Sequence, residues 1–162
     1  MKILVIGIGN SYRSDDGIGL ILARKLQELH LPHVEVSEQS GEGAQLIEAW
    51  SNTEAVILFD AVYSGAKPGT IFRLNANEEK IPTSFFNYST HAFSLAESIE
   101  LTRVLGRLPR HCIIFGIEGK TFAFGETLSE EVTVVIDIVM NKIVKEIDLL
   151  RELLLKGVEL EQ

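Results

Sequence analysis

Cysteine is nearly absent from this sequence, since Cys112 is the single thiol among 162 residues. One thiol cannot form a disulfide within the chain, and it cannot supply a multi-cysteine metal site. The segment around it, HCIIFGI, is apolar and predicts a small buried side chain on a strand. We therefore expect neither a disulfide-stapled fold nor a cysteine-rich metal centre.

Positive charge and long apolar runs are also scarce. The chain has 15 Lys and Arg against 23 Asp and Glu, which gives a net charge of -8. Nucleic acid is not an expected partner, because phosphate contacts need a basic face. The apolar runs fall short of the roughly 20 residues that span a bilayer, and the run at 3–9 is too short for a signal peptide. We expect no membrane partner and a cytoplasmic protein.

Apolar runs that alternate with amphipathic segments make up most of the chain, whose length is typical of one domain. Strands that alternate with helices predict a mostly parallel sheet with helices on both faces. The connection before TIFRL is too short for a crossover helix, so this strand should be antiparallel to the third. We expect a single domain over 1–162. Its expected strands are 2–7, 34–38, 54–61, 70–74 and 111–118, and its expected helices are 17–30, 43–51, 92–105 and one long helix from Ser129 to about Lys156.

The segment GIGNSYRSDDGIG at 7–19 follows the first strand and resembles a dinucleotide-binding loop. That loop needs a third glycine where this chain has Tyr12, and Asp15 and Asp16 would repel a phosphate at the helix start. One aspartate can be a helix cap, but two adjacent carboxylates exceed what a cap requires and suit a cation or its ligands. Gly17 and Gly19 are poor helix formers, so we expect that something else selects them, such as the close approach of another chain.

Further acidic residues follow the third and fifth strands, at Asp60 and Glu118. Ligands of doubly wound sheets gather at the carboxyl ends of the strands. We therefore expect both residues at the same edge as the glycine-rich segment. His91 lies where a long loop enters a helix that Ser89 or Thr90 should cap. A helix start disfavours imidazolium and leaves a neutral ring able to bind a metal, although a histidine in this position can also be structural.

The loop at 75–90 has no clear periodicity, and long loops in compact domains are often functional. We expect this loop to line a cleft leading to the acidic residues, because glycines permit a close approach of the backbone. Its aromatic residues can either pack on a bound peptide or cover the core. The glycines in question are Gly17, Gly41 and Gly43, and the aromatic residues are Phe85, Phe86 and Tyr88.

Three segments, GIGNSYRSDDGIG, LFDAV and STHAFSL, together resemble the maturation endopeptidases of nickel–iron hydrogenases, in order and spacing along almost the whole chain. The resemblance implies that Asp16, Asp60 and His91 contact nickel. It also implies a three-layer α/β/α sandwich with a five-stranded mixed sheet of order 2-1-3-5-4 and an antiparallel strand 4. The chain departs from the family pattern after its second strand, where SEQSGEGAQ places Glu38 at the acidic position.

The function implied by this resemblance is removal of the C-terminal extension from a hydrogenase large-subunit precursor. Two carboxylates and one imidazole form a weak metal site by themselves, so we expect nickel to arrive with the precursor and the enzyme to be a monomer. Nickel can be catalytic or only a recognition handle. No covalent nucleophile is recognisable. A metal-sensing chaperone and a nucleotide-binding module are the alternatives, and the roles of Asp15, Glu38 and Glu118 stay open.

Overall fold

The computed structural model describes residues 2–160, with side chains through residue 157. A five-stranded sheet has the order β2-β1-β3-β5-β4. Neighbouring strands are parallel except β4, which is antiparallel to β5. The strands are β1 (Ile3–Ile8), β2 (Val34–Gln39), β3 (Ala55–Val62), β4 (Ile71–Asn75) and β5 (His111–Glu118). This confirms the predicted fold class and strand order, and β4, which pairs with β5, runs antiparallel to β3 as expected.

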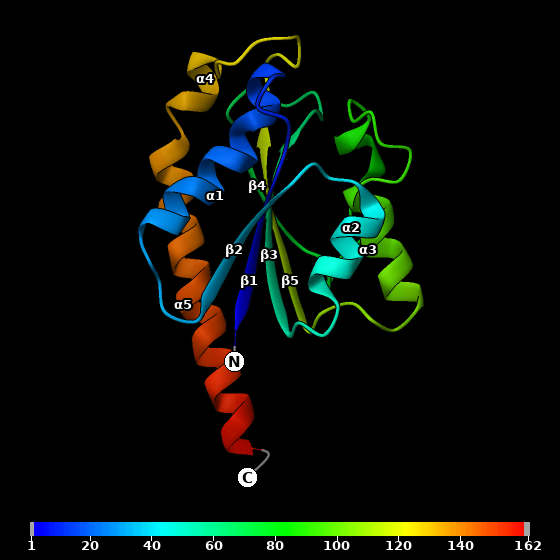
Figure 1. Ribbon diagram of the computed structural model, residues 1–162, viewed down its shortest axis with the longest axis vertical. Helices are drawn as coiled ribbons and strands as arrows, with labels where there is room; N and C mark the ends of the chain where they lie inside the picture. The colour runs from blue at the N-terminus through cyan, green and yellow to red at the C-terminus, as the bar shows by residue number, and fades with distance from the viewer. Residues whose placement is uncertain (1, 161–162) are drawn as a thin grey trace.

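Helices cover both faces of the sheet and make three layers (Figure 1). One face carries α1, α4 and α5, and the other carries α2 and α3. The helices are α1 (Ile18–Glu28), α2 (Gly43–Trp50), α3 (Leu95–Val104), α4 (Glu130–Thr133) and α5 (Ile136–Leu160), with the short 3-10 helices η1 (Ser14–Gly17) and η2 (Thr83–Phe86). No helix within the described residues is long and apolar enough to cross a membrane.

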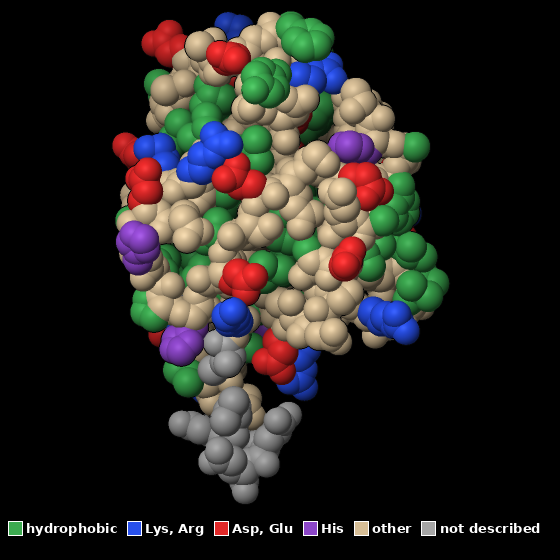
Figure 2. All heavy atoms as spheres, viewed as in Figure 1, with side chains coloured by type: hydrophobic (Ala, Val, Ile, Leu, Met, Phe, Trp, Pro, Cys, Tyr) green, Lys and Arg blue, Asp and Glu red, His purple; other side chains and the backbone are tan. Residues whose placement is uncertain are grey.

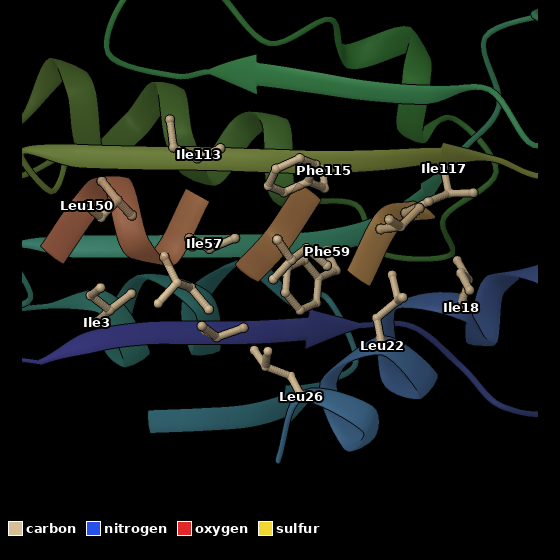
Figure 3. Close-up of a cluster of buried hydrophobic side chains, with 14 of the residues drawn as sticks. Ile3, Ile18, Leu22, Leu26, Ile57, Phe59, Ile113, Phe115, Ile117 and Leu150 are labelled. Carbon is tan, nitrogen blue, oxygen red and sulfur yellow. The ribbon is translucent and has the colours of Figure 1, made fainter. Parts of the chain in front are cut away.

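The core is divided by the sheet, because alternate side chains of each strand point to opposite faces. In β3, Ile57 and Phe59 face α1 and α5, where they meet Phe115 of β5 (Figure 3). The neighbouring Val56 and Leu58 face α2 and α3. By this alternation Asp60 projects from the α2/α3 face, at the carboxyl edge of a fully buried strand.

Two helix predictions were wrong. The long helix expected from Ser129 is interrupted at Val134–Val135 and gives two helices, because five consecutive β-branched residues at 132–136 weaken helix formation there. Its second part continues past Lys156, the expected end, to Leu160. The helix expected at 92–105 begins at Leu95, where Ser94 and Glu97 form a reciprocal capping box.

Candidate active site

Glycines of the segment 7–19 let helix α1 lie directly on the sheet. A Cβ atom at Gly19 would come within 2.2 Å of the carbonyl oxygen of Ile8 and 2.6 Å of that of Phe59. A Cβ atom at Gly9 would come within 2.0 Å of the carbonyl oxygen of Asp16. The segments that approach Gly19 closely belong to this chain, and a Cβ atom at Gly17 would meet its nearest neighbour, Ser11, only at 3.4 Å, so an approach of another chain to these glycines stays a prediction. The glycine-rich pattern serves contacts within the chain and gives no support to a phosphate site.

A cavity of about 380 Å³ opens at the carboxyl edge of the sheet. It brings together loops that follow β1, β2 and η2, together with the end of β3. Asp16, Asp60 and His91, the three predicted site residues, all line it. The other lining residues are Ile8, Gly9, Asn10, Ser11, Tyr12, Arg13, Leu20, Ser40, Gly41, Phe86, Tyr88, Ser89, Thr90, Ser94 and Leu95.

Asp60 is the most deeply buried of the three residues, with only 5% of its surface exposed. Burial raises the pKa of its carboxyl well above the usual value, and repulsion from Asp16 raises it further. Burial also raises the pKa of Asp16, against the opposing effects of Tyr88 and Arg13. Two carboxyl groups in one buried cavity thus retain a proton at pH values where an exposed pair would be fully ionised.

Tyr88 connects this carboxyl pair to the protein around it. Its hydroxyl group donates toward the carbonyl oxygen of Ala61 at 2.5 Å and toward Oδ1 of Asp60 at 3.2 Å. Its ring stacks on Phe122, with 4.1 Å between the ring centroids. Burial, followed by the two nearby carboxyls, raises the pKa of the Tyr88 phenol well above its usual value. The phenol therefore stays protonated and keeps its role as a donor.

His91 lies in the loop between η2 and α3, four residues before the helix begins, and not at the expected helix start. Its Nε2 atom is 3.2 Å from the carbonyl oxygen of Ser40, in the loop after β2. The side chain of Ser89, an expected cap, instead accepts a hydrogen bond from the backbone N–H of His91. Among the described residues no three His, Cys, Asp or Glu side chains are close enough to hold a metal ion. Convergence of the three residues on one metal stays a prediction.

The neighbouring acidic residues have structural contacts. The carboxylate of Asp15 accepts hydrogen bonds from the backbone N–H groups of Lys120, Thr121 and Ser129, at 2.8, 3.1 and 2.7 Å, and thereby anchors the loop after β5. Glu118 is at the expected edge, but its carboxylate accepts from Ser64 and Gly65 in the β3–β4 turn. Glu38 is paired with Arg24, at 2.7 Å, on the surface. None of these three acids lines the cavity.

The expected cleft is confirmed only in part. Gly41 lines the cavity, whereas Gly17 and Gly43 do not. A Cβ atom at Gly43 would lie 2.1 Å from the Phe93 ring, so this glycine serves helix packing. Of the aromatic residues in the 75–90 loop, Phe86 and Tyr88 line the cavity, yet Phe86 is buried in the α2/α3 core and Phe85 packs against that core. These two phenylalanines cover the core.

Comparison with known proteins places the chain in a family. The sequence model of the hydrogenase maturation protease family matches residues 21–146, a range that includes Asp60 and His91 and begins after Asp16. The chain belongs to the hydrogenase maturation protease family. It is accordingly a peptidase, as the sequence predicted.

Curated relatives of this maturation protease have related names. "Hydrogenase 2 maturation protease" of Escherichia coli (strain K12) is 30% identical over 121 residues, which are 72% of this chain and 73% of the relative. "Hydrogenase expression/formation protein HupD" of Thiocapsa roseopersicina is 29% identical over 119 residues, covering 72% of this chain and only 54% of the relative. The similarity to HupD therefore extends over little more than half of that protein.

Solved structures share the fold of this maturation protease. The hydrogenase maturating endopeptidase HybD from E. coli has a TM-score of 0.77 at 24% identity, covering 91% of this chain and 93% of the other. A solution structure of an endopeptidase from E. coli also gives 0.77, at 26% identity, covering 88% and 90%. The five-stranded mixed sheet and its flanking helices are thus the architecture of these endopeptidases.

In this maturation protease the sequence did not single out Tyr88 as a partner of Asp60. The only signal was the aromatic cluster in the 75–90 loop, whose members could equally well pack on a bound peptide or cover the core. The hydrogen-bond partners of Tyr88 lie 27 and 28 residues away in the sequence, and only the folded chain brings them together.

Proposed function

We propose that this protein removes the C-terminal extension of a nickel-loaded hydrogenase large-subunit precursor, and that Asp16, Asp60 and His91 recognise the nickel. The supporting observation is that these three side chains, from three separate segments, line one cavity at the carboxyl edge of the sheet. The family membership and the names of the relatives supply the substrate class.

The donor chemistry of the cavity agrees with a metal that belongs to the substrate. Carboxylate oxygen and imidazole nitrogen bind borderline divalent ions, but a tight nickel or zinc site needs more or softer ligands. The raised pKa values of the two carboxyl groups add a further barrier, because a metal must displace any bound proton before it binds. Nickel already held by the precursor brings its own ligands, so the enzyme adds only the remaining donors.

The cavity residues also support the hydrolysis of a peptide bond. Once the nickel of the precursor has displaced the bound proton, a carboxylate oxygen that does not contact the metal can act as the general base for an attacking water. Asp16 suits the role of the base better than Asp60, because it is less buried and its pKa is raised less. Nickel bound to the precursor supplies a Lewis acid or a fixed point that orients the peptide.

The deciding experiment is mass spectrometry of a precursor incubated with the purified protein, with and without prior nickel loading. We expect a mass loss only for the nickel-loaded precursor. Asp60→Ala and His91→Ala should abolish this processing, and Asp16→Glu should retain more activity than Asp16→Ala because it keeps a carboxylate. Glu38→Gln is the matched control, since Glu38 is an acidic residue outside the cavity.

Two results would contradict the proposal. One is efficient cleavage of a nickel-free precursor, and the other is full activity of the His91→Ala variant. Binding of the loaded precursor without any cleavage would instead favour the metal-sensing chaperone. Calorimetric titration of the isolated protein with Ni²⁺ tests whether the enzyme holds nickel without the precursor, and we expect only weak binding.

A further inference from the structure

Three exposed aromatic side chains lie at the carboxyl edge of the sheet. Tyr12, Tyr63 and Phe124 are 61%, 56% and 92% exposed, and they follow β1, β3 and β5 respectively. Within residues 2–157, every other aromatic side chain is buried or partly buried. We call this group the aromatic rim. Figure 2 shows hydrophobic side chains standing out from the surface at the top of the molecule, where Figure 1 places the β5–α4 loop beside η1.

The backbone that carries Phe124 and Tyr12 is firmly held. The N–H group of Gly125 donates to the carbonyl oxygen of Tyr12 at 2.9 Å, and the N–H of Ser14 donates to the carbonyl of Gly125 at 2.8 Å. The hydroxyl of Ser14 donates to the carbonyl of Ala123, also at 2.8 Å. Phe124 is therefore displayed by a loop that is bonded to the first loop on both sides of the exposed ring.

The third member of the rim is connected to the cavity through Phe122. The ring of Tyr63 meets Phe122 edge-on, with 5.8 Å between centroids, and Phe122 stacks on Tyr88. Tyr12 and Tyr88 both line the cavity. The aromatic rim is thus continuous with the cavity that contains Asp16 and Asp60.

Folding alone does not explain why these aromatic side chains are exposed to water. Leaving a phenylalanine in water forgoes roughly 1.5–3 kcal/mol of burial, and Phe124 is almost fully exposed on a fixed backbone. Rigid aromatic side chains are well suited to protein recognition, because they bury a large area while losing little conformational freedom. The arrangement favours a partner protein that covers the rim.

We propose that the aromatic rim docks the apolar surface of the large-subunit precursor next to its C-terminal extension, an inference that rests on the proposed function. An endopeptidase must bring a protein chain to its cavity, and the rim borders the cavity mouth through Tyr12. A second copy of this chain bound at the rim would obstruct the same entrance. The precursor therefore fits the position of the rim better than self-association does.

The test compares Phe124→Ser and Tyr63→Ser with the unchanged protein. Biolayer interferometry measures the affinity for a nickel-loaded precursor, and the mass assay measures the half-saturating precursor concentration and the maximal rate. We expect each variant to weaken binding and raise the half-saturating concentration about tenfold, as for a central interface residue. The maximal rate should stay within about twofold, because neither side chain lines the cavity.

Val104→Ser is the matched control, since Val104 is an aliphatic residue, 76% exposed, at the end of α3 and outside the cavity. It should leave the affinity unchanged. Equal affinity of the unchanged protein and both rim variants would overturn the docking role while leaving the proposed function intact. A dimer in sedimentation velocity that Phe124→Ser dissociates would also overturn it. Absence of cleavage by the unchanged protein would contradict the proposed function, and the binding measurement would still decide about the rim.

Discussion

The hydroxyl group of Tyr88 donates a hydrogen bond toward Oδ1 of Asp60 across 3.2 Å, in a cavity where Asp60 has few other partners for its carboxyl group. The opposite side of the tyrosine is fixed as well, because its ring stacks on Phe122. The loop before α3 thus restrains a carboxyl group that belongs to the sheet. This contact makes Tyr88 a positioning residue for Asp60.

Tyr88→Phe removes the hydroxyl and retains the stacked ring. We expect precursor processing to slow by about 10- to 100-fold, the usual effect of losing a residue that orients a metal ligand, which is the role proposed for Asp60. The thermal midpoint should fall modestly, because the carbonyl oxygen of Ala61 loses the same donor. Tyr63→Phe is the control. It also removes a tyrosine hydroxyl from a ring that packs on Phe122, but Tyr63 does not line the cavity. Normal processing by Tyr88→Phe would show that Asp60 is positioned without it.

Asp60→Asn should increase stability at neutral and alkaline pH. Because the pKa of Asp60 is raised in the folded state, its proton favours folding at low pH, and this contribution is lost as the pH rises through the folded pKa. Asparagine removes the cost of ionisation. Thermal unfolding from pH 4 to 8 should show a gain that is small near pH 4 and reaches at least ~2 °C at pH 8, for a chain of this size. A variant less stable than the unchanged protein at every pH would refute this explanation.

Thiol reagents should leave the folded enzyme active. Cys112 is buried on β5, and burial raises the pKa of its thiol to about 12, so the reactive thiolate is scarce. We expect no iodoacetamide adduct after an hour at pH 8 by mass spectrometry, and unchanged processing of the precursor. Protein unfolded in urea provides the positive control for alkylation. Rapid alkylation with loss of activity would make Cys112 a candidate nucleophile.

The strands were predictable because their signal is local. The runs around Ile57 and Ile113 are continuous and apolar, as buried parallel strands require, and the predicted bounds of all five strands agree with the observed ones to within one residue. The strand order came from the family resemblance. The helix interruption at Val134 was missed because the apolar stripe continues across it, even though the β-branched residues there oppose a continuous helix.

The sequence predicted which residues line the candidate site, but it did not predict their contacts. Asp16 and Asp60 line one cavity because parallel strands place their carboxyl ends at the same edge. Asp15 and Glu118 looked equally suitable from the sequence. Their donors lie more than 50 residues away, in loops without periodicity, so only the folded structure reveals that both acids are already satisfied.

Replacing Asp15 should therefore lower the stability of the protein, whereas replacing the adjacent Asp16 should abolish processing without lowering stability. Asp15 is fully buried, and its carboxylate also accepts the hydroxyl of Ser129 at 2.8 Å, in addition to three backbone N–H groups. Asp15→Ala would leave those donors unpaired, at a cost of about 3 kcal/mol or more, which corresponds to a midpoint lower by roughly 6–12 °C.

Asp16→Ala should leave the thermal midpoint equal or higher, since burial opposes ionisation of Asp16, and yet it should abolish processing. Calorimetric melting of the two variants, together with the mass assay, separates the two roles. Asp15→Asn refines the comparison, because it preserves the side-chain volume while placing an amide donor against the N–H groups of Lys120 and Thr121. If Asp15→Ala melts at the same temperature as Asp16→Ala, the anchoring of the β5–α4 loop by Asp15 is refuted.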